Sequence, residues 1–145
     1  NVEDLEWDVT PGNDPEDSLQ YDYWDHVDFI IEEAQKRDIY IGLLPAWGDK
    51  VVSDGTGPVL FRDSTESCSY ARKLAERYGL RQNIIWILGG DRHAVGQVDR
   101  DGVMVTEDHR PVWRGMARAN RDVCGEDVFI TYHPRWDDGL FYRRG

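Results

Sequence analysis

The 145-residue sequence has little cysteine, a deficit of positive charge and no apolar run long enough to cross a membrane. Its two cysteines, Cys68 and Cys124, cannot build a disulfide framework, and both lie in helical patterns that favour free thiols. The 17 Lys and Arg residues against 28 Asp and Glu give a formal charge of −11. This charge argues against nucleic acid and anionic membranes as partners. The sequence also lacks a P-loop, a Gly-x-Gly-x-x-Gly segment and a Gly-x-Ser-x-Gly elbow, so nucleotide binding and serine hydrolysis are unsupported.

Helical and strand patterns alternate along the chain. Apolar residues at helical spacing predict three helices, over 22–37, from 63 to 79 and from Pro111 to about 123. The second begins with a capping box at 63–66 and ends at Gly79, a typical helix terminator. Apolar runs predict buried strands over 39–45, 83–88 and 128–132. Alternation of this kind indicates a parallel α/β sheet with right-handed crossovers. Three strands are too few for a closed (β/α)8 barrel, so the chain is either a small open sheet or part of a barrel. The absence of an initiating Met and the polar C-terminus favour the partial barrel.

The segment 92–105 reads as a long loop with a turn at Asp99-Arg100-Asp101-Gly102 between two short extended pieces. The Asp-x-Asp-Gly spacing raises the question of calcium, but the rest of an EF-hand loop is absent. A plain turn is the better interpretation.

The most informative stretch is the apolar run at 84–88, which ends in Gly89-Gly90 and then Asp91-Arg92. A carboxylate delivered at the carboxyl end of a buried parallel strand lies where α/β barrels carry out their chemistry. The other two strands end in polar clusters at the same predicted edge, so the three clusters should converge. These residues are Trp47, Asp49 and Lys50, then Asp91 and Arg92, then His133 and Arg135.

Each of these residues also has a purely structural interpretation. Asp91 could cap the next segment and pair with Arg92. Asp49 and Lys50 could form a solvated ion pair, Trp47 could plug the barrel rim, and His133 could be structural. Asp49, Asp91 and His133 together could instead hold a divalent metal, but no closely spaced ligand pair supports that, and no cofactor is expected.

Four blocks of the sequence resemble a known family. These are Tyr23-Trp24-Asp25-His26-Val27-Asp28-Phe29-Ile30-Ile31, Gly42-Leu43-Leu44-Pro45-Ala46-Trp47-Gly48-Asp49-Lys50, Trp86-Ile87-Leu88-Gly89-Gly90-Asp91-Arg92 and Ile130-Thr131-Tyr132-His133-Pro134. In this order they are similar to the apiosidase-like glycoside hydrolases, glycoside hydrolase family 140 and its relatives. The resemblance covers about 23–135, whereas 94–105 matches no family block.

The resemblance implies a partial (β/α)8 TIM barrel whose three strands are roughly the third to the fifth. It also implies a retaining glycosidase of bacterial origin, secreted or periplasmic, that hydrolyses plant cell-wall polysaccharides or oligosaccharides. Asp91 would be the general acid/base, and the nucleophile, a glutamate near the end of the seventh strand, would lie outside the chain. Trp47 would stack on a sugar, while Asp49, Lys50, Arg92 and His133 would bind substrate, with Arg92 directed away from the Asp91 carboxyl group.

On this interpretation residues 1–145 form part of one catalytic domain, with a loop at 1–20 and a family-like core at 21–135. The expected partners are a carbohydrate substrate and the remainder of the barrel, without which the chain would be inactive and prone to aggregation. Two alternatives stay open, a non-catalytic carbohydrate-binding module that uses Trp47 and Tyr132, and a metal-dependent hydrolase on the same barrel.

Overall fold

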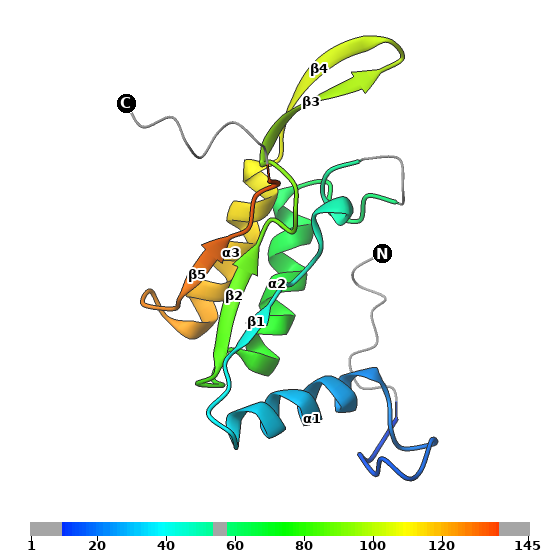
Figure 1. Ribbon diagram of the computed structural model, residues 1–145, viewed down its shortest axis with the longest axis vertical. Coiled ribbons are helices and arrows are strands. Elements are labelled where there is room, and N and C mark those ends of the chain that lie inside the picture. Colours follow the sequence, from blue (N-terminus) through cyan, green and yellow to red (C-terminus); the bar gives the residue numbers. More distant parts are fainter. Residues whose placement is uncertain (1–9, 54–57, 137–145) are drawn as a thin grey trace.

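The computed structural model describes residues 10–53 and 58–136. Helices and strands alternate as predicted, with a hairpin inserted after the second strand (Figure 1). In chain order the elements are α1 (Tyr23–Gln35), β1 (Ile41–Leu43), the short 3-10 helix η2 (Gly48–Lys50), α2 (Ser64–Tyr78), β2 (Ile84–Leu88), β3 (Val95–Arg100), β4 (Val103–Asp108), α3 (Arg110–Cys124) and β5 (Ile130–Tyr132).

The three buried strands form a parallel sheet in the order β1-β2-β5. Ile41 pairs with Ile84, and Trp86 pairs with Ile130, so β2 is the central strand. Helices α2 and α3 cover one face of the sheet, and the carboxyl ends of all three strands point toward the hairpin (Figure 1). The sheet thus confirms the predicted α/β class and brings the three strand ends to one edge.

The core lies between the sheet and its helices. Trp86 and Leu88 are buried beneath α2 and α3, where Ala71, Met116 and Ala119 have no exposed surface. The helices approach closely because Gly115 lies against Ser67, whose hydroxyl donates to the carbonyl oxygen of Val112 at 2.9 Å. This packing fixes the helical layer behind the strands that carry the site.

Helix α1 packs on the amino-terminal side of this core. Its buried Ile31 contacts the cluster that contains Leu74 and Tyr78, and Arg77 of α2 forms a 2.7 Å ion pair with Asp28. Its other face exposes Tyr23, Phe29 and Ile30. No helix in 10–53 or 58–136 has the length and apolar character needed to cross a membrane.

The helix caps follow the sequence with two corrections. Asp22 and Asp25 form a reciprocal capping box on α1. Asp63 caps α2, but Glu66 accepts from the backbone N–H of Arg62 and does not close the predicted box. Gly79 has a φ of −65°, so it is no left-handed terminator. Glycine fits there because a Cβ would lie 2.3 Å from the Cys124 sulfur. Both cysteines are free thiols.

Two segment lengths differ from prediction. The paired strands β1 and β5 are shorter than 39–45 and 128–132, and the flanking Ile39, Tyr40 and Phe129 are exposed. The hairpin is longer than predicted, because β4 continues in paired form to Asp108. Its turn is the predicted one, since Asp101 and Gly102 take φ values of 54° and 82°, as tight hairpin turns require.

Candidate active site

The turn after β2 presents Asp91 at the carboxyl edge of the sheet. Gly89, Gly90 and Asp91 have positive φ values of 101°, 59° and 60°. Asp91 is therefore a non-glycine residue in the left-handed region, a conformation that persists only where its surroundings hold it. The sequence indicated a sharp turn from its two glycines, but not that Asp91 itself continues it.

Hydrogen bonds from both neighbouring strand ends hold this turn. The Gly48 N–H donates to the Gly90 carbonyl oxygen at 3.1 Å, and the His133 N–H donates to the Leu88 carbonyl oxygen at 2.7 Å. The Arg92 guanidinium donates to the carbonyl oxygen of Asp91 at 2.8 Å. All three strand ends are thus tied to the segment that carries Asp91.

Close backbone packing explains the glycines at the edge. A Cβ on Gly48 would lie 2.4 Å from the carbonyl oxygens of both Gly89 and Gly90, and one on Gly89 would lie 2.4 Å from the carbonyl oxygen of His133. Gly48 and Gly89 are therefore needed for close approach, in addition to any need for backbone freedom.

Asp91, His133 and Trp47 come together as the sequence predicted. His133 Nδ1 lies 3.2 Å from Asp91 Oδ1, and the two side chains are 53% and 48% exposed. The Trp47 ring lies 6.4 Å from the His133 ring, centroid to centroid, and is half exposed. The segment after Asp91 leads into a strand and not into a helix, so the capping interpretation of Asp91 does not apply.

Asp49 and Lys50 lie in η2, close to the turn. They form the ion pair that the sequence allowed, at 2.8 Å, and the Asp49 side chain is 20% exposed. Asp49 Oδ1 is buried and has no hydrogen-bond partner among the residues the structure describes.

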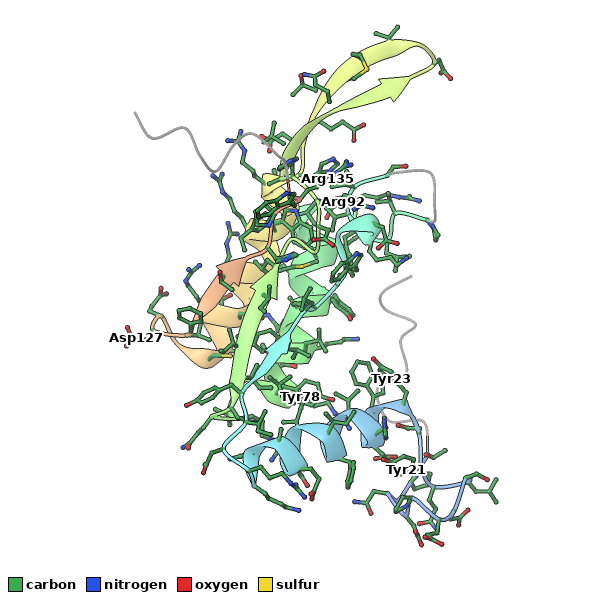
Figure 2. The ribbon with its side chains drawn as sticks, in the orientation of Figure 1. Tyr21, Tyr23, Tyr78, Arg92, Asp127 and Arg135 are labelled. Carbon is green, nitrogen blue, oxygen red and sulfur yellow. The ribbon has the colours of Figure 1, made fainter. Side chains whose placement is uncertain are left out.

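Asp91 borders a cavity of about 590 Å³ at the base of the hairpin. Figure 2 shows Arg92 and Arg135 close together there. The cavity is lined by Val52, Ser53, Asp91, Arg92, Gln97, Arg135 and Trp136. Ser53, Gln97 and Trp136 were not predicted, because they come from loops and a hairpin that carry no strand-end signal.

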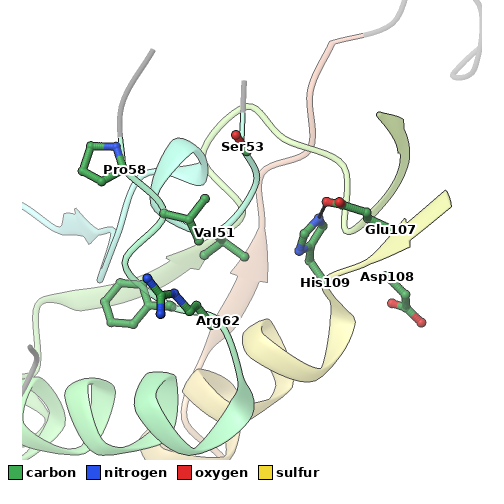
Figure 3. Close-up of a pocket in the computed structure, with 9 residues that line it drawn as sticks. Val51, Ser53, Pro58, Arg62, Glu107, Asp108 and His109 are labelled. Atoms are coloured by element: carbon green, nitrogen blue, oxygen red, sulfur yellow. Dashed lines mark ion pairs between the residues drawn. The ribbon is translucent and has the colours of Figure 1, made fainter. Parts of the chain in front are cut away.

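A second cavity of about 640 Å³ lies between the loop after η2 and the start of α3 (Figure 3). His109 and Glu107, which are 3.1 Å apart, lie on one side of it, and Val51 and Arg62 contribute to the rest of its lining. Within the described ranges no three His, Cys, Asp or Glu side chains gather as a metal site would require. Asp49, Asp91 and His133, which the sequence left open as an alternative metal site, are not such a group among the described residues.

The Tyr132 hydroxyl donates to the carbonyl oxygen of Arg92 at 2.8 Å, which ties β5 to the segment after Asp91. We expect Tyr132→Phe in the full-length protein to lower the free energy of unfolding by about 1 kcal/mol. Burial raises the pKa of Tyr132 to about 12, whereas the pKa of tyrosine in an unfolded chain is about 10. The hydroxyl therefore contributes its full stabilisation below about pH 10, and this contribution disappears as the pH rises through about 12. Thermal midpoints at pH 6 and pH 9 should therefore show the same gap between the two proteins. A gap that closes at pH 9 would show that the hydroxyl does not act in this way.

Comparison with solved structures defines the class of the protein. A crystal structure of a glycoside hydrolase family 5 protein from Bacteroides vulgatus ATCC 8482 superposes with a TM-score of 0.60 at 34% identity, over 84% of this chain and 22% of that one. A structure described as a glycoside hydrolase superposes with a TM-score of 0.61 at 31% identity, over 82% of this chain and 22% of that one. The three-stranded sheet thus matches part of a glycoside hydrolase TIM barrel, and the chain spans about a fifth of the length of these relatives.

A family model described as apiosidase-like, catalytic domain, matches residues 4–142. The chain belongs to this family, as the four sequence blocks predicted. No curated protein matches it.

Proposed function

We propose that this chain is part of a retaining glycoside hydrolase that acts on plant cell-wall polysaccharides or oligosaccharides, with Asp91 as the general acid/base. The observation that carries the proposal is the position of Asp91. It extends from a held left-handed turn at the end of the central strand, beside His133, and it borders a cavity. A carboxyl group in this position can reach a ligand that lies across the barrel mouth.

The chemistry needs one carboxyl group that gives a proton and another that attacks. Asp91 would donate its proton to the glycosidic oxygen as the bond to the anomeric carbon breaks. The second carboxylate, in our interpretation a glutamate from the seventh strand of the barrel, would bond to the anomeric carbon. Asp91 would then take a proton from the water that hydrolyses this glycosyl-enzyme, so the anomeric configuration is retained.

His133 would orient the acid. Its Nδ1 lies 3.2 Å from Asp91 Oδ1, and this contact would orient the carboxyl group and leave Oδ2 to meet the glycosidic oxygen. The half-exposed Trp47 ring would stack on the sugar, and Asp49, Lys50 and Arg92 would bind its hydroxyl groups. Such contacts hold the scissile bond within reach of Asp91, which is a large part of the rate enhancement in enzymes.

The remainder of the barrel is the partner that this site needs. Strands β1 and β5 each pair on one side only among the described residues, and the sheet face opposite α2 and α3 exposes Gly42 and Thr131. The 145 residues alone would lack the nucleophile and expose two strand edges, so we expect them to be inactive and prone to aggregate. Secretion or export to the periplasm fits a glycan substrate outside the cell.

The test uses the full-length parent protein, with the isolated 145-residue chain as a matched control. Both are incubated with pectic and hemicellulosic oligosaccharides and with aryl glycosides, and sugar release and product anomer are followed by NMR. We expect the parent to release sugar with retained configuration and the isolated chain to release none. No release from any substrate by the parent would contradict the proposal, as would an inverted product.

A further inference from the structure

The hairpin β3–β4 is placed to contact whatever Asp91 acts on. Val95, where β3 begins, lies four residues after Asp91 in the sequence, and the two strands extend beyond the carboxyl edge of the sheet (Figure 1). The base of the hairpin closes at the N-cap residue of α3, because the His109 N–H donates to the Ala94 carbonyl oxygen at 2.7 Å. The hairpin thus has a firm attachment beside the site, although a two-stranded ribbon has little stability by itself.

One side chain of the hairpin enters the lining of the Asp91 cavity. Gln97 lies on β3 directly opposite Thr106 of β4, and its amide nitrogen donates to the Thr106 hydroxyl oxygen. This bond orients the carboxamide of an otherwise exposed side chain, whose oxygen can still accept a hydrogen bond. Trp136, which follows β5, lines the same cavity and is 71% exposed. An oriented amide and an exposed indole that line one cavity form a suitable surface for a sugar ring.

The mechanism decides which part of the substrate this wall meets. The sugar that is attacked lies between Asp91 and the nucleophile, whose carboxyl groups are about 5 Å apart in retaining enzymes. The leaving group departs on the side of the acid, since the acid protonates its oxygen. The cavity of about 590 Å³ adjoins Asp91 and the hairpin, and its volume lies within the usual range of about 300–1,000 Å³ for ligand pockets.

We propose that the hairpin forms the wall of a subsite for the leaving-group sugar, with Gln97 bonding a hydroxyl group and Trp136 stacking on the ring. This inference rests on the proposed function and specifies its substrate class. The substrate is a glycan with at least one sugar beyond the scissile bond, and a small aglycone does not fill the site.

Two variants of the full-length parent test this subsite. Gln97→Ala removes the carboxamide alone. Deletion of residues 97–98 and 105–106 shortens the hairpin by two paired positions and keeps the Asp101-Gly102 turn. Val103→Thr is the matched control, because residue 103 is exposed and, by strand alternation, lies on the face opposite Thr106. Each protein is assayed on the oligosaccharide that the wild type cleaves fastest and on the glycosyl fluoride of the released sugar, whose leaving group is a single atom.

We expect Gln97→Ala to lower kcat/KM on the oligosaccharide about tenfold, mainly through KM, with the fluoride unaffected. The shortened hairpin should lower kcat/KM on the oligosaccharide about 100-fold, which is the effect expected from the loss of two such contacts. Its kcat/KM on the fluoride should stay unchanged. Unchanged oligosaccharide rates in both variants, or equal losses on both substrates, would overturn the subsite while leaving the proposed function intact. A wild-type protein that cleaves neither substrate would overturn the proposed function and the subsite with it.

Discussion

Asp91→Asn in the full-length parent is expected to lower kcat/KM on oligosaccharides by about 1,000-fold, within the range of about 10²–10⁴ that general acid–base catalysis contributes. Asparagine keeps the size of the side chain but has no proton of the required acidity to give to a sugar leaving group. A dinitrophenolate leaving group needs little protonation, so the loss in the bond-breaking step should be less than about tenfold on a dinitrophenyl glycoside. The values of kcat/KM on the two substrates measure the difference, because kcat/KM reports the bond-breaking step and not the later hydrolysis that Asp91 also assists.

Asp49→Asn provides the matched control for this prediction. Asp49 is another carboxylate at the same edge, but it is paired with Lys50 and has no role in proton transfer in our account. Its replacement should reduce the rates on both substrates by a similar factor, since it weakens substrate binding in general. If Asp91→Asn lowered kcat/KM by the same factor on the oligosaccharide and on the dinitrophenyl glycoside, as expected for Asp49→Asn, Asp91 would not be the acid.

Gly48→Ala is expected to be the most damaging small substitution at the edge. Its Cβ would lie 2.4 Å from two carbonyl oxygens of the Asp91 turn, and one of them, that of Gly90, accepts the Gly48 N–H bond that ties η2 to the turn. We expect a loss of about 3 kcal/mol in the free energy of unfolding of the full-length parent. The thermal midpoint should fall by about 5–10 °C, and activity should fall with it because the turn that presents Asp91 is displaced.

Gly96→Ala is the control, because no heavy atom lies within 4 Å of a Cβ built on Gly96. Its effect on stability should stay within about 0.5 kcal/mol. If the two alanine variants had the same thermal midpoint, the close contact between η2 and the Asp91 turn would not exist in the protein.

Features that depend on local pattern could be predicted from the sequence. The buried run at 84–88 identified the central strand, and Asp22 and Asp63 identified two helix starts. The convergence of Trp47, Asp91 and His133 followed from topology alone, because parallel strands end at one edge. The catalytic and binding roles of these residues stay predictions.

Features that depend on contacts between distant segments could not be predicted. The reason for glycine at Gly48 was not visible in the sequence, and Gly79 was predicted to be a left-handed helix terminator, until Gly90 and Cys124 were placed against them. The lengths of β1 and β5 depend on where the neighbouring strand pairs, and apolar residues outside the paired region stay exposed. Gln97 could be assigned to the cavity only from the hairpin register and the cavity lining, because an isolated glutamine in a loop carries no distinctive sequence signal.

The most direct test of the account is chemical rescue of Asp91→Ala in the full-length parent. The variant is given a dinitrophenyl glycoside with and without azide, and the product is identified by NMR. We predict that azide, which needs no base, attacks the glycosyl-enzyme in the space left by Asp91, accelerates turnover and gives a glycosyl azide of retained configuration. An Asp91→Ala protein as active as the wild type, or one that gives no glycosyl azide, would show that the Gly89-Gly90-Asp91 turn is structural and that Asp91 is not the acid/base.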